Sequence, residues 1–277
     1  KSEYPVPSKL NIPQTATFTT SKQSVVSMGD WGRTPWNLWK SHWNNRSGFG
    51  NRRLSFAIIV MFSLMVGLPY VLTNRLAHYM DRNSLDIELP LDTQLPFIAW
   101  MVIPYISLYF YYPTSALLGS KNDLMWRQNI IFTQIVVITS WICFAVFVLL
   151  PVEIDLRHLI VGVEGTAWEP WFALVHGADR PWNSWPSLHV VQSTQVVLIL
   201  RYWYPSDTRK VWILQTTLLV CWALLVISTM TIKQHYLWDA VSALALTGIT
   251  WRYWMKPALD RCAAPEYADA FDEAMKA

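Results

Sequence analysis

Six stretches of mostly apolar residues constrain this 277-residue chain more than any other feature of its sequence. An α-helix needs about 20 mostly apolar residues to cross the hydrocarbon core of a bilayer. Helices are favoured there because a spanning segment must satisfy its own backbone hydrogen bonds. The stretches predict an all-α, polytopic membrane bundle of six transmembrane helices. They cover residues 54–72, 95–112, 130–150, 188–204, 211–230 and 236–254.

Composition supports a lipid environment. Only 15% of the residues are charged, whereas a soluble domain carries about 25%. The 17 Trp and 12 Tyr residues belong to the types that favour membrane–water interfaces. The fourth stretch is the least apolar, since it contains consecutive polar residues from Gln192 to Gln195. These side chains need partners within the bundle, so we expect this helix to be interior.

Cationic residues predict the orientation, because short cytoplasmic loops carry an excess of Lys and Arg. Basic residues flank or connect the stretches on one side: Arg46, Arg52, Arg53, Lys121, Arg127, Arg201, Arg209, Lys210, Arg252, Lys256 and Arg261. The alternate connections are acidic: Asp81, Asp86, Glu88, Asp92, Glu153, Asp155, Glu164, Glu169 and Asp179. Both termini are therefore expected in the cytoplasm. The connections 1–2, 3–4 and 5–6 are expected outside, in the periplasm, a lumen or the exterior.

Three regions follow from this pattern. We expect an N-terminal cytoplasmic tail at 1–51, a membrane domain at 52–256 and a C-terminal cytoplasmic tail at 257–277. Within the first tail, Trp36, Trp39 and Trp43 recur at spacings that place them on one helical face. Two interpretations remain open: a helix lying on the membrane surface, or an amphipathic helix packed on protein.

The predicted topology brings several chemically capable residues to the outer face. Ser187 and His189 open the fourth helix, where free N–H groups and the positive end of the helix dipole favour a phosphate. His189 can donate a proton to a leaving oxygen. Ser is also a common helix cap, and a single His near an interface is more often structural. Arg180, a short distance before Ser187, can bind phosphate oxygens with two donors.

His235 and Asp239 form the second half of the candidate site. Residues four apart on a helix share a face, so Asp239 can bind one ring nitrogen of His235 and leave the other free as a nucleophile. An acid just inside a membrane helix is a functional candidate. A structural His–Asp pair is the alternative. Lys233 can supply a second cation, although Lys233 and Arg180 can also extend to the interface.

Three motifs, taken in order, resemble the type-2 phosphatidic acid phosphatase superfamily. They are Arg180-Pro181, Pro186-Ser187-Leu188-His189 and Ser228-x6-His235-x3-Asp239. The resemblance implies that His235 attacks phosphorus to form a phosphohistidine, that Asp239 orients His235 and that His189 protonates the leaving alcohol. It implies that Arg180 and Ser187 hold the phosphate oxygens. It implies no metal, and we expect no cofactor.

A closer branch is also indicated. Thr231-Ile232-Lys233-Gln234-His235-Tyr236 and Asp92-x2-Leu95-Pro96-Phe97, followed by Pro104-Tyr105 and Tyr109, resemble the inositol phosphorylceramide synthase-like branch. Two cations of the superfamily motifs are missing. Ala173 occupies the position of a Lys and Thr229 that of an Arg. Each lost contact weakens transition-state binding by a few kcal/mol, although this branch often lacks the same cations.

The expected function is therefore that of an integral membrane lipid phosphatase or lipid head-group phosphotransferase. It acts through a phosphohistidine at the outer face. The expected partners are a membrane lipid phosphate and the bilayer, and the net charge of +3 is too small to favour nucleic acid. The alternative is a non-catalytic membrane binding or assembly subunit with the same fold, which the absence of the two motif cations favours.

Overall fold

The computed structural model describes residues 32–80 and 84–276, and its regular elements there are all helical. The all-α prediction is confirmed for this part of the chain. An isolated bridge between Val152 and Asn183 pairs two loop segments. Residues 1–31 of the expected N-terminal tail lie outside the described residues, as does Asp81.

Within the described residues, three helices are long and apolar enough to cross a membrane. The first runs for 28 residues through α3 (Arg53–Phe62), the π-helical η3 (Ser63–Gly67) and α4 (Leu68–Met80). The second is α8 (Asp123–Leu149) and the third is α11 (Arg209–Thr231). They correspond to the first, third and fifth predicted stretches. Long apolar helices of this kind are expected in a helical membrane protein.

The second predicted stretch is helical but broken. It contains η4 (Ala99–Met101), α6 (Val102–Ile106) and α7 (Leu108–Leu118). Pro104 lies just before the break and has no N–H to donate. At the break itself, the hydroxyl of Ser107 donates a hydrogen bond to the Pro104 carbonyl. These pieces are each too short to span a bilayer alone.

The fourth and sixth stretches form α10 (Leu188–Trp203) and α12 (Leu237–Thr250). Helix α12 continues through the π-helical η6 (Trp251–Met255) into α13 (Lys256–Arg261). The helices at the predicted positions are therefore present. The number of spans and the cytoplasmic location of the termini stay predictions.

Helix α10 is the interior helix, as its polar residues predicted. It packs on α7, α8, α11 and α12, and nearly all of its residues are buried. The Gln192 amide donates to Ser140 Oγ at 2.7 Å and its oxygen accepts from the Tyr112 hydroxyl. Thr194 accepts from Trp222 Nε1 at 3.1 Å. Gln192 and Thr194 thus find partners inside the bundle, whereas the amide of the buried Gln195 has none among the described residues.

The Trp-rich segment packs on protein, which decides between the two interpretations of its sequence. It forms η2 (Asn37–Trp39) and α1 (Lys40–Asn44). Trp39 and Trp43 are buried in the main core rather than turned to lipid. The indole N–H of Trp39 donates to Gln134 Oε1 at 2.9 Å.

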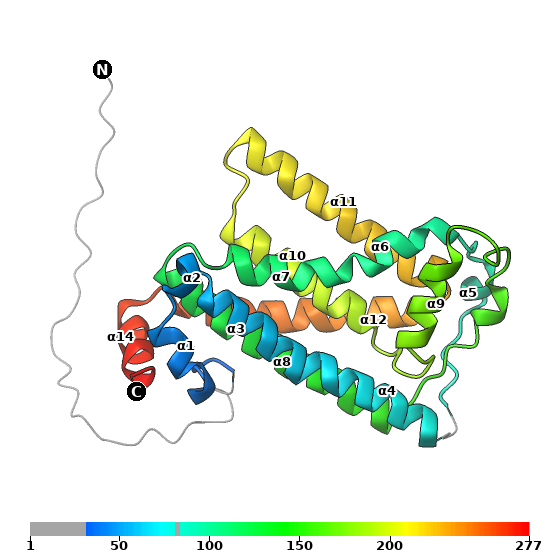
Figure 1. The fold of residues 1–277 in the computed structure, drawn as a ribbon, viewed down its shortest axis with the longest axis horizontal. Coiled ribbons are helices and arrows are strands. Elements are labelled where there is room, and N and C mark those ends of the chain that lie inside the picture. Colours follow the sequence, from blue (N-terminus) through cyan, green and yellow to red (C-terminus); the bar gives the residue numbers. More distant parts are fainter. Residues whose placement is uncertain (1–31, 81–83, 277) are drawn as a thin grey trace. The chain divides into compact units, whose positions relative to one another are not determined.

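Residues 32–277 form one compact unit, and the boundaries of the expected tails stay predictions. The C-terminal helix α14 (Pro265–Ala274) packs on the N-terminal segment through a contact of 5.0 Å between the ring centroids of Phe271 and Trp43. The short α2 (Gly48–Asn51) leads into α3. Helices α1, α2 and α14 lie at one end of the bundle (Figure 1).

The opposite end carries three short helices from the connections. These are α5 (Pro90–Gln94), η5 (Arg157–Leu159) and α9 (Glu169–Ala178). Figure 1 shows α5 and α9 beside the starts of α10 and α12 at this end. The candidate site residues gather here.

Candidate active site

The His235–Asp239 pair forms as predicted, but by a different local structure. His235 precedes α12, and Tyr236 is the N-cap residue of that helix. Asp239 Oδ2 accepts from Tyr236 N at 3.0 Å and lies 3.1 Å from His235 Nδ1. The acid therefore caps the helix and binds the histidine at once. A carboxylate only accepts, so Nδ1 carries the proton. The described residues offer His235 Nε2 no hydrogen-bond partner, which leaves its lone pair free.

His189 lies next to this pair, in the first turn of α10. The centroid of its ring is 5.7 Å from that of His235, in an edge-to-face arrangement. Tyr105 of α6 stacks on its other side at 4.3 Å. Within the described part of the chain, neither ring nitrogen of His189 has a hydrogen-bond partner. Packing thus fixes the His189 ring and leaves its polar atoms available.

Ser187 is the N-cap residue of α10 and is fully buried. Its backbone N–H donates to the Asp239 carbonyl at 3.2 Å, which joins the two motifs directly. Its hydroxyl is buried with no hydrogen-bond partner among the described residues. A buried, unsatisfied hydroxyl is costly unless something else occupies it. This hydroxyl lies at the N-terminus of α10, and the N-terminus of a helix favours an anion.

Arg180 lies in the loop before α10 and is exposed. Its backbone is fixed, because its N–H and carbonyl both bind the Asn74 amide at 2.9 Å. Its guanidinium makes no hydrogen bond or ion pair with the described residues. The structure therefore brings Ser187, His189, His235 and Asp239 together. It leaves Arg180 exposed in the loop that precedes α10.

Lys233 is held elsewhere. Its ammonium donates to the carbonyls of Asp92 and Leu95 at 2.8 and 2.7 Å, and the residue is 1% exposed. Both acceptors belong to α5 or to its C-cap, and the Lys233 backbone has a positive φ of 61°. These contacts make Lys233 a structural link between α5 and the turn before α12. They do not direct its charge to the histidines.

Asp92 is the other part of that link. In the sequence it is one of the acids of a connection between apolar stretches, and the structure buries it. Its carboxylate accepts from Leu237 N at 2.7 Å and from Leu89 N at 2.8 Å. Asp92 thus helps to hold the first turn of α12, on which Asp239 lies.

Sequence reasoning missed Arg157. Its Nη2 donates to the Asp179 carbonyl at 2.8 Å and to Gln234 Oε1 at 3.1 Å. Gln234 precedes His235, and its amide nitrogen lies 3.2 Å from His176 Nε2. The only available signal was that Arg157 and Arg180 are the two Arg residues in an otherwise acidic connection.

Burial shifts the pKa values of three ionisable side chains here, those of Arg157, Asp179 and His176. It lowers the pKa of Arg157, although the nearby Asp179 carboxylate opposes the shift. Burial raises the pKa of Asp179, opposed by a hydrogen bond with Tyr70 and by the charges of His235 and Arg157. Burial and the Arg157 charge lower the pKa of His176 to about 4. His176 is therefore neutral at physiological pH.

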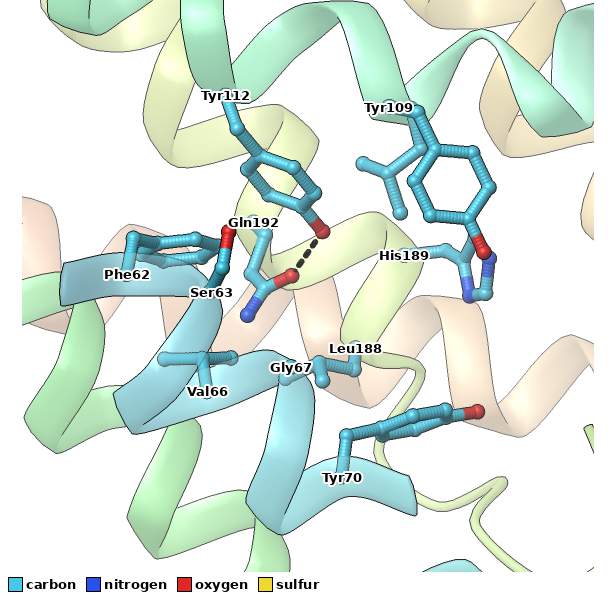
Figure 2. Close-up of a pocket in the computed structure, with 11 residues that line it drawn as sticks. Phe62, Ser63, Val66, Gly67, Tyr70, Tyr109, Tyr112, Leu188, His189 and Gln192 are labelled. Atoms are coloured by element: carbon cyan, nitrogen blue, oxygen red, sulfur yellow. Dashed lines mark hydrogen bonds between the residues drawn. The ribbon is translucent and has the colours of Figure 1, made fainter. Parts of the chain in front are cut away.

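Two cavities meet at His189. One of about 190 Å³ lies between α3–α4 and the pair α7 and α10. Its walls are mostly apolar, with Phe62 and Ser63 toward one end and Tyr70 and His189 toward the other (Figure 2). A second, of about 220 Å³, shares Tyr70, Tyr109 and His189 and is also lined by Asp179. Both cavities are mostly apolar, so a bound molecule can contact His189 from two largely apolar sides, with Asp179 in the wall of the second.

Within residues 32–80 and 84–276, no group of three or more His, Cys, Asp or Glu side chains is arranged to hold a metal ion. The polar atoms available at the site are His235 Nε2, the two ring nitrogens of His189, the Ser187 hydroxyl and the N-terminal N–H groups of α10. This set suits an anion that can be attacked by one histidine and protonated by the other.

Comparison with known proteins gives one finding. The family model of the PAP2 superfamily, the type-2 phosphatidic acid phosphatases, matches residues 161–261, less than half of the chain. The matched region contains Arg180, Ser187, His189, His235 and Asp239. The match supports the superfamily resemblance, whose members hydrolyse or transfer phosphate esters. The inositol phosphorylceramide synthase-like branch is not confirmed. No curated protein and no solved structure gave a significant match.

Proposed function

We propose that this protein is an integral membrane enzyme that hydrolyses a lipid phosphate ester or transfers a phosphoryl head group between lipids. The observation that carries the proposal is the arrangement of two buried histidines, with ring centroids 5.7 Å apart. One of them is bound to Asp239. A nucleophile oriented by an acid, with a proton donor on its other side, is the constellation that covalent catalysis requires.

The first half of the reaction forms a bond between His235 Nε2 and phosphorus. The bond from phosphorus to the lipid alcohol oxygen breaks, and the proton of His189 passes to that oxygen. Asp239 keeps the Nδ1–H tautomer and stabilises the positive charge that develops on the His235 ring. The product is a phosphohistidine, with the free alcohol as leaving group.

The second half reverses these roles. Water or an acceptor alcohol attacks phosphorus while His189, now neutral, takes its proton. The N–P bond breaks and its electron pair returns to His235 Nε2. Water gives hydrolysis, and a lipid hydroxyl gives transfer. His189 ends protonated and His235 neutral, so the cycle closes without an external reagent.

Phosphate oxygens are held by the Ser187 hydroxyl and the N-terminal N–H groups of α10. Arg180 supplies a cation from the surface of the same loop. The unsatisfied Ser187 hydroxyl supports this assignment, because a phosphate oxygen would satisfy it. Lys233 is not included, since its ammonium is bound to the α5 carbonyls.

The substrate class is a membrane lipid phosphate. The cavity between α3–α4 and α7–α10 is lined by apolar and aromatic side chains, which suits an acyl or prenyl segment. It ends at His189, the residue assigned to protonate the lipid oxygen. On the orientation that the Lys and Arg residues predict, the reaction takes place at the outer face of the membrane.

The test is His235→Ala in purified full-length protein, assayed for phosphate release and for head-group transfer on a panel of lipid phosphates. His158→Ala is the control, because His158 is exposed in the same outer region. We expect activity in the wild type and the control, and a loss of at least about 10³-fold in His235→Ala. Full activity of His235→Ala in both assays would exclude the mechanism. Product identification separates hydrolysis from transfer.

A non-catalytic binding or assembly subunit is the second candidate, and it is favoured by the absence of the motif cations at Ala173 and Thr229. Orthovanadate, an analogue of the transition state for phosphoryl transfer, distinguishes the two. Covalent phosphate on His235, or protection by vanadate, supports the enzyme. Absence of both from a folded wild type that turns over no substrate supports the subunit.

A further inference from the structure

Arg157 carries a half-buried charge that has no ion-pair partner among the described residues. Its two hydrogen bonds, both from Nη2, go to a carbonyl and to an amide oxygen, which are neutral acceptors. Its Nε is buried and has no acceptor in the part of the chain that the structure describes. The Asp179 carboxylate is close enough to interact with this charge but forms no ion pair with it, and a buried N–H without an acceptor is costly. The guanidinium is therefore a binding position for an anion.

Its surroundings place this anion at the histidine site. Arg157 binds Gln234, the residue next to the proposed nucleophile. The backbone N–H groups of Gln234 and His235 both donate to the Thr229 carbonyl, at 3.1 and 3.0 Å. The guanidinium thus contacts the same turn that positions His235. Asp179, whose carbonyl it also binds, lines the cavity that reaches His189.

We propose that Arg157 binds a non-bridging oxygen of the substrate phosphate. The proposal rests on the proposed function and adds to it a cation that no motif identifies. Thr229, where the superfamily motif has Arg, is buried and directs its hydroxyl to the Val226 carbonyl at 2.8 Å. A cation nevertheless reaches this turn from η5, more than 70 residues earlier in the chain.

A purely structural role does not account for the charge. The two contacts of Nη2 fix the loop against Gln234, and a neutral donor would satisfy the same acceptors. Nε and Nη1 remain, with three N–H groups between them. These donors suit phosphate oxygens, for which the planar guanidinium is well matched. The two hydrogen bonds of Nη2 orient the guanidinium, and its Nε and Nη1 donors bind the anion.

The experiment measures binding of inorganic phosphate, and separately of orthovanadate, by the rise in the unfolding midpoint of the full chain in detergent. The variants are Arg157→Gln, Arg157→Lys and the neighbouring control His158→Gln. We expect Arg157→Gln to need about 10- to 100-fold more phosphate for the same rise, the loss typical of a charge-assisted contact. Arg157→Lys should fall between Arg157→Gln and the wild type. The control should match the wild type.

Equal phosphate dependence of Arg157→Gln and the wild type would overturn the proposal. So would failure of both Arg157 variants to fold without phosphate, which would assign the residue to the scaffold. Rescue of phosphate binding in Arg157→Ala by millimolar ethylguanidinium supports it, because a small cation restores the charge but not the link to the loop. Turnover is scored separately. Phosphate binding that depends on Arg157 in a protein without turnover would retain the anion site and reject the enzyme.

Discussion

His235 Nδ1 lies 3.1 Å from Asp239 Oδ2, and both side chains are buried at the start of α12. The same carboxylate oxygen accepts the backbone N–H of Tyr236. Asp239 therefore has two roles, and their effects can be measured separately. It fixes the tautomer of the histidine, and it caps the helix.

Asp239→Asn keeps the size of the side chain but replaces a pure acceptor by a group that can also donate. We expect turnover of the lipid phosphate to fall by about 10²- to 10⁴-fold, because the His235 tautomer with a free Nε2 is no longer favoured. The loss of stability should be smaller, on the order of 1 kcal/mol, the typical value of a helix cap. Steady-state kinetics and thermal unfolding measure the two effects.

Asp260→Asn is the matched control for this change. Asp260 is exposed and binds Lys256 and Tyr202 at the other end of the bundle. The turnover of the Asp260→Asn variant should equal that of the wild type. Comparable losses of turnover in both variants would mean that the Asp239 effect is general rather than catalytic.

Lys233→Ala tests whether the ammonium serves structure or substrate. Removing it leaves the Asp92 and Leu95 carbonyls without their donor. We expect a loss of roughly 2 to 4 kcal/mol in the free energy of unfolding. KM for the lipid phosphate should change little in protein that remains folded. Lys256→Ala, an exposed pair with Asp260, should cost at most about 1 kcal/mol. A large rise in KM with unchanged stability would restore Lys233 to the phosphate site.

Lys233 shows which kind of contact could not be predicted from the sequence. The local patterns predicted the helices, the interior position of α10 and the His235–Asp239 contact, because each depends on residues near one another in the chain. Lys233 binds carbonyls about 140 residues away, and Trp39 binds Gln134 from 95 residues away. Nothing local distinguishes such a partner from a phosphate or a lipid head group.

Arg157 was missed for the same reason. Its contact with Gln234 spans 77 residues, and Arg157 itself belongs to none of the motifs. The match to the superfamily begins at residue 161, beyond Arg157. Only the fold of the outer connections brings this cation to the turn before His235. The six spans and the orientation of the termini stay predictions.

His176 predicts a pH dependence of stability. Its pKa is lowered to about 4 in the folded protein from an ordinary value of 6.5, by burial and by the charge of Arg157. Between these values the unfolded chain binds the proton and the folded chain does not, so stability falls as the pH decreases from 6.5 toward 4. His176→Gln should lose less stability than the wild type over this range. Thermal unfolding at a series of pH values measures the difference, and identical slopes for the two proteins would contradict the prediction.

Trp39→Phe tests the packing of the N-terminal segment on the bundle. The change removes the indole donor to Gln134 from a residue that is 0% exposed. We expect a loss of about 1 to 3 kcal/mol in the free energy of unfolding, from the hydrogen bond and from the smaller ring. Trp212→Phe is the control, because Trp212 is 56% exposed. Equal stability of the two variants would place Trp39 at a lipid surface instead of in the core.

Gly67→Leu tests whether the cavity beside His189 holds the lipid chain. Gly67 lines this cavity, and a Cβ added there meets nothing within 4 Å. A leucine therefore extends into the open space without displacing the wall. Each methylene of a lipid chain that it excludes costs about 0.8 kcal/mol of binding. KM should thus rise by about tenfold or more for a long-chain lipid phosphate and change little for a short-chain analogue.

Gly248→Leu is the control for this substitution. Gly248 also has free space around its Cα, but it lies on the exposed face of α12 away from the cavity. It should leave KM for both substrates unchanged. If Gly67→Leu raised KM equally for long and short chains, the cavity would be assigned to the head group. If it changed neither, the lipid chain would have to leave His189 by another path, through the second cavity beside Asp179.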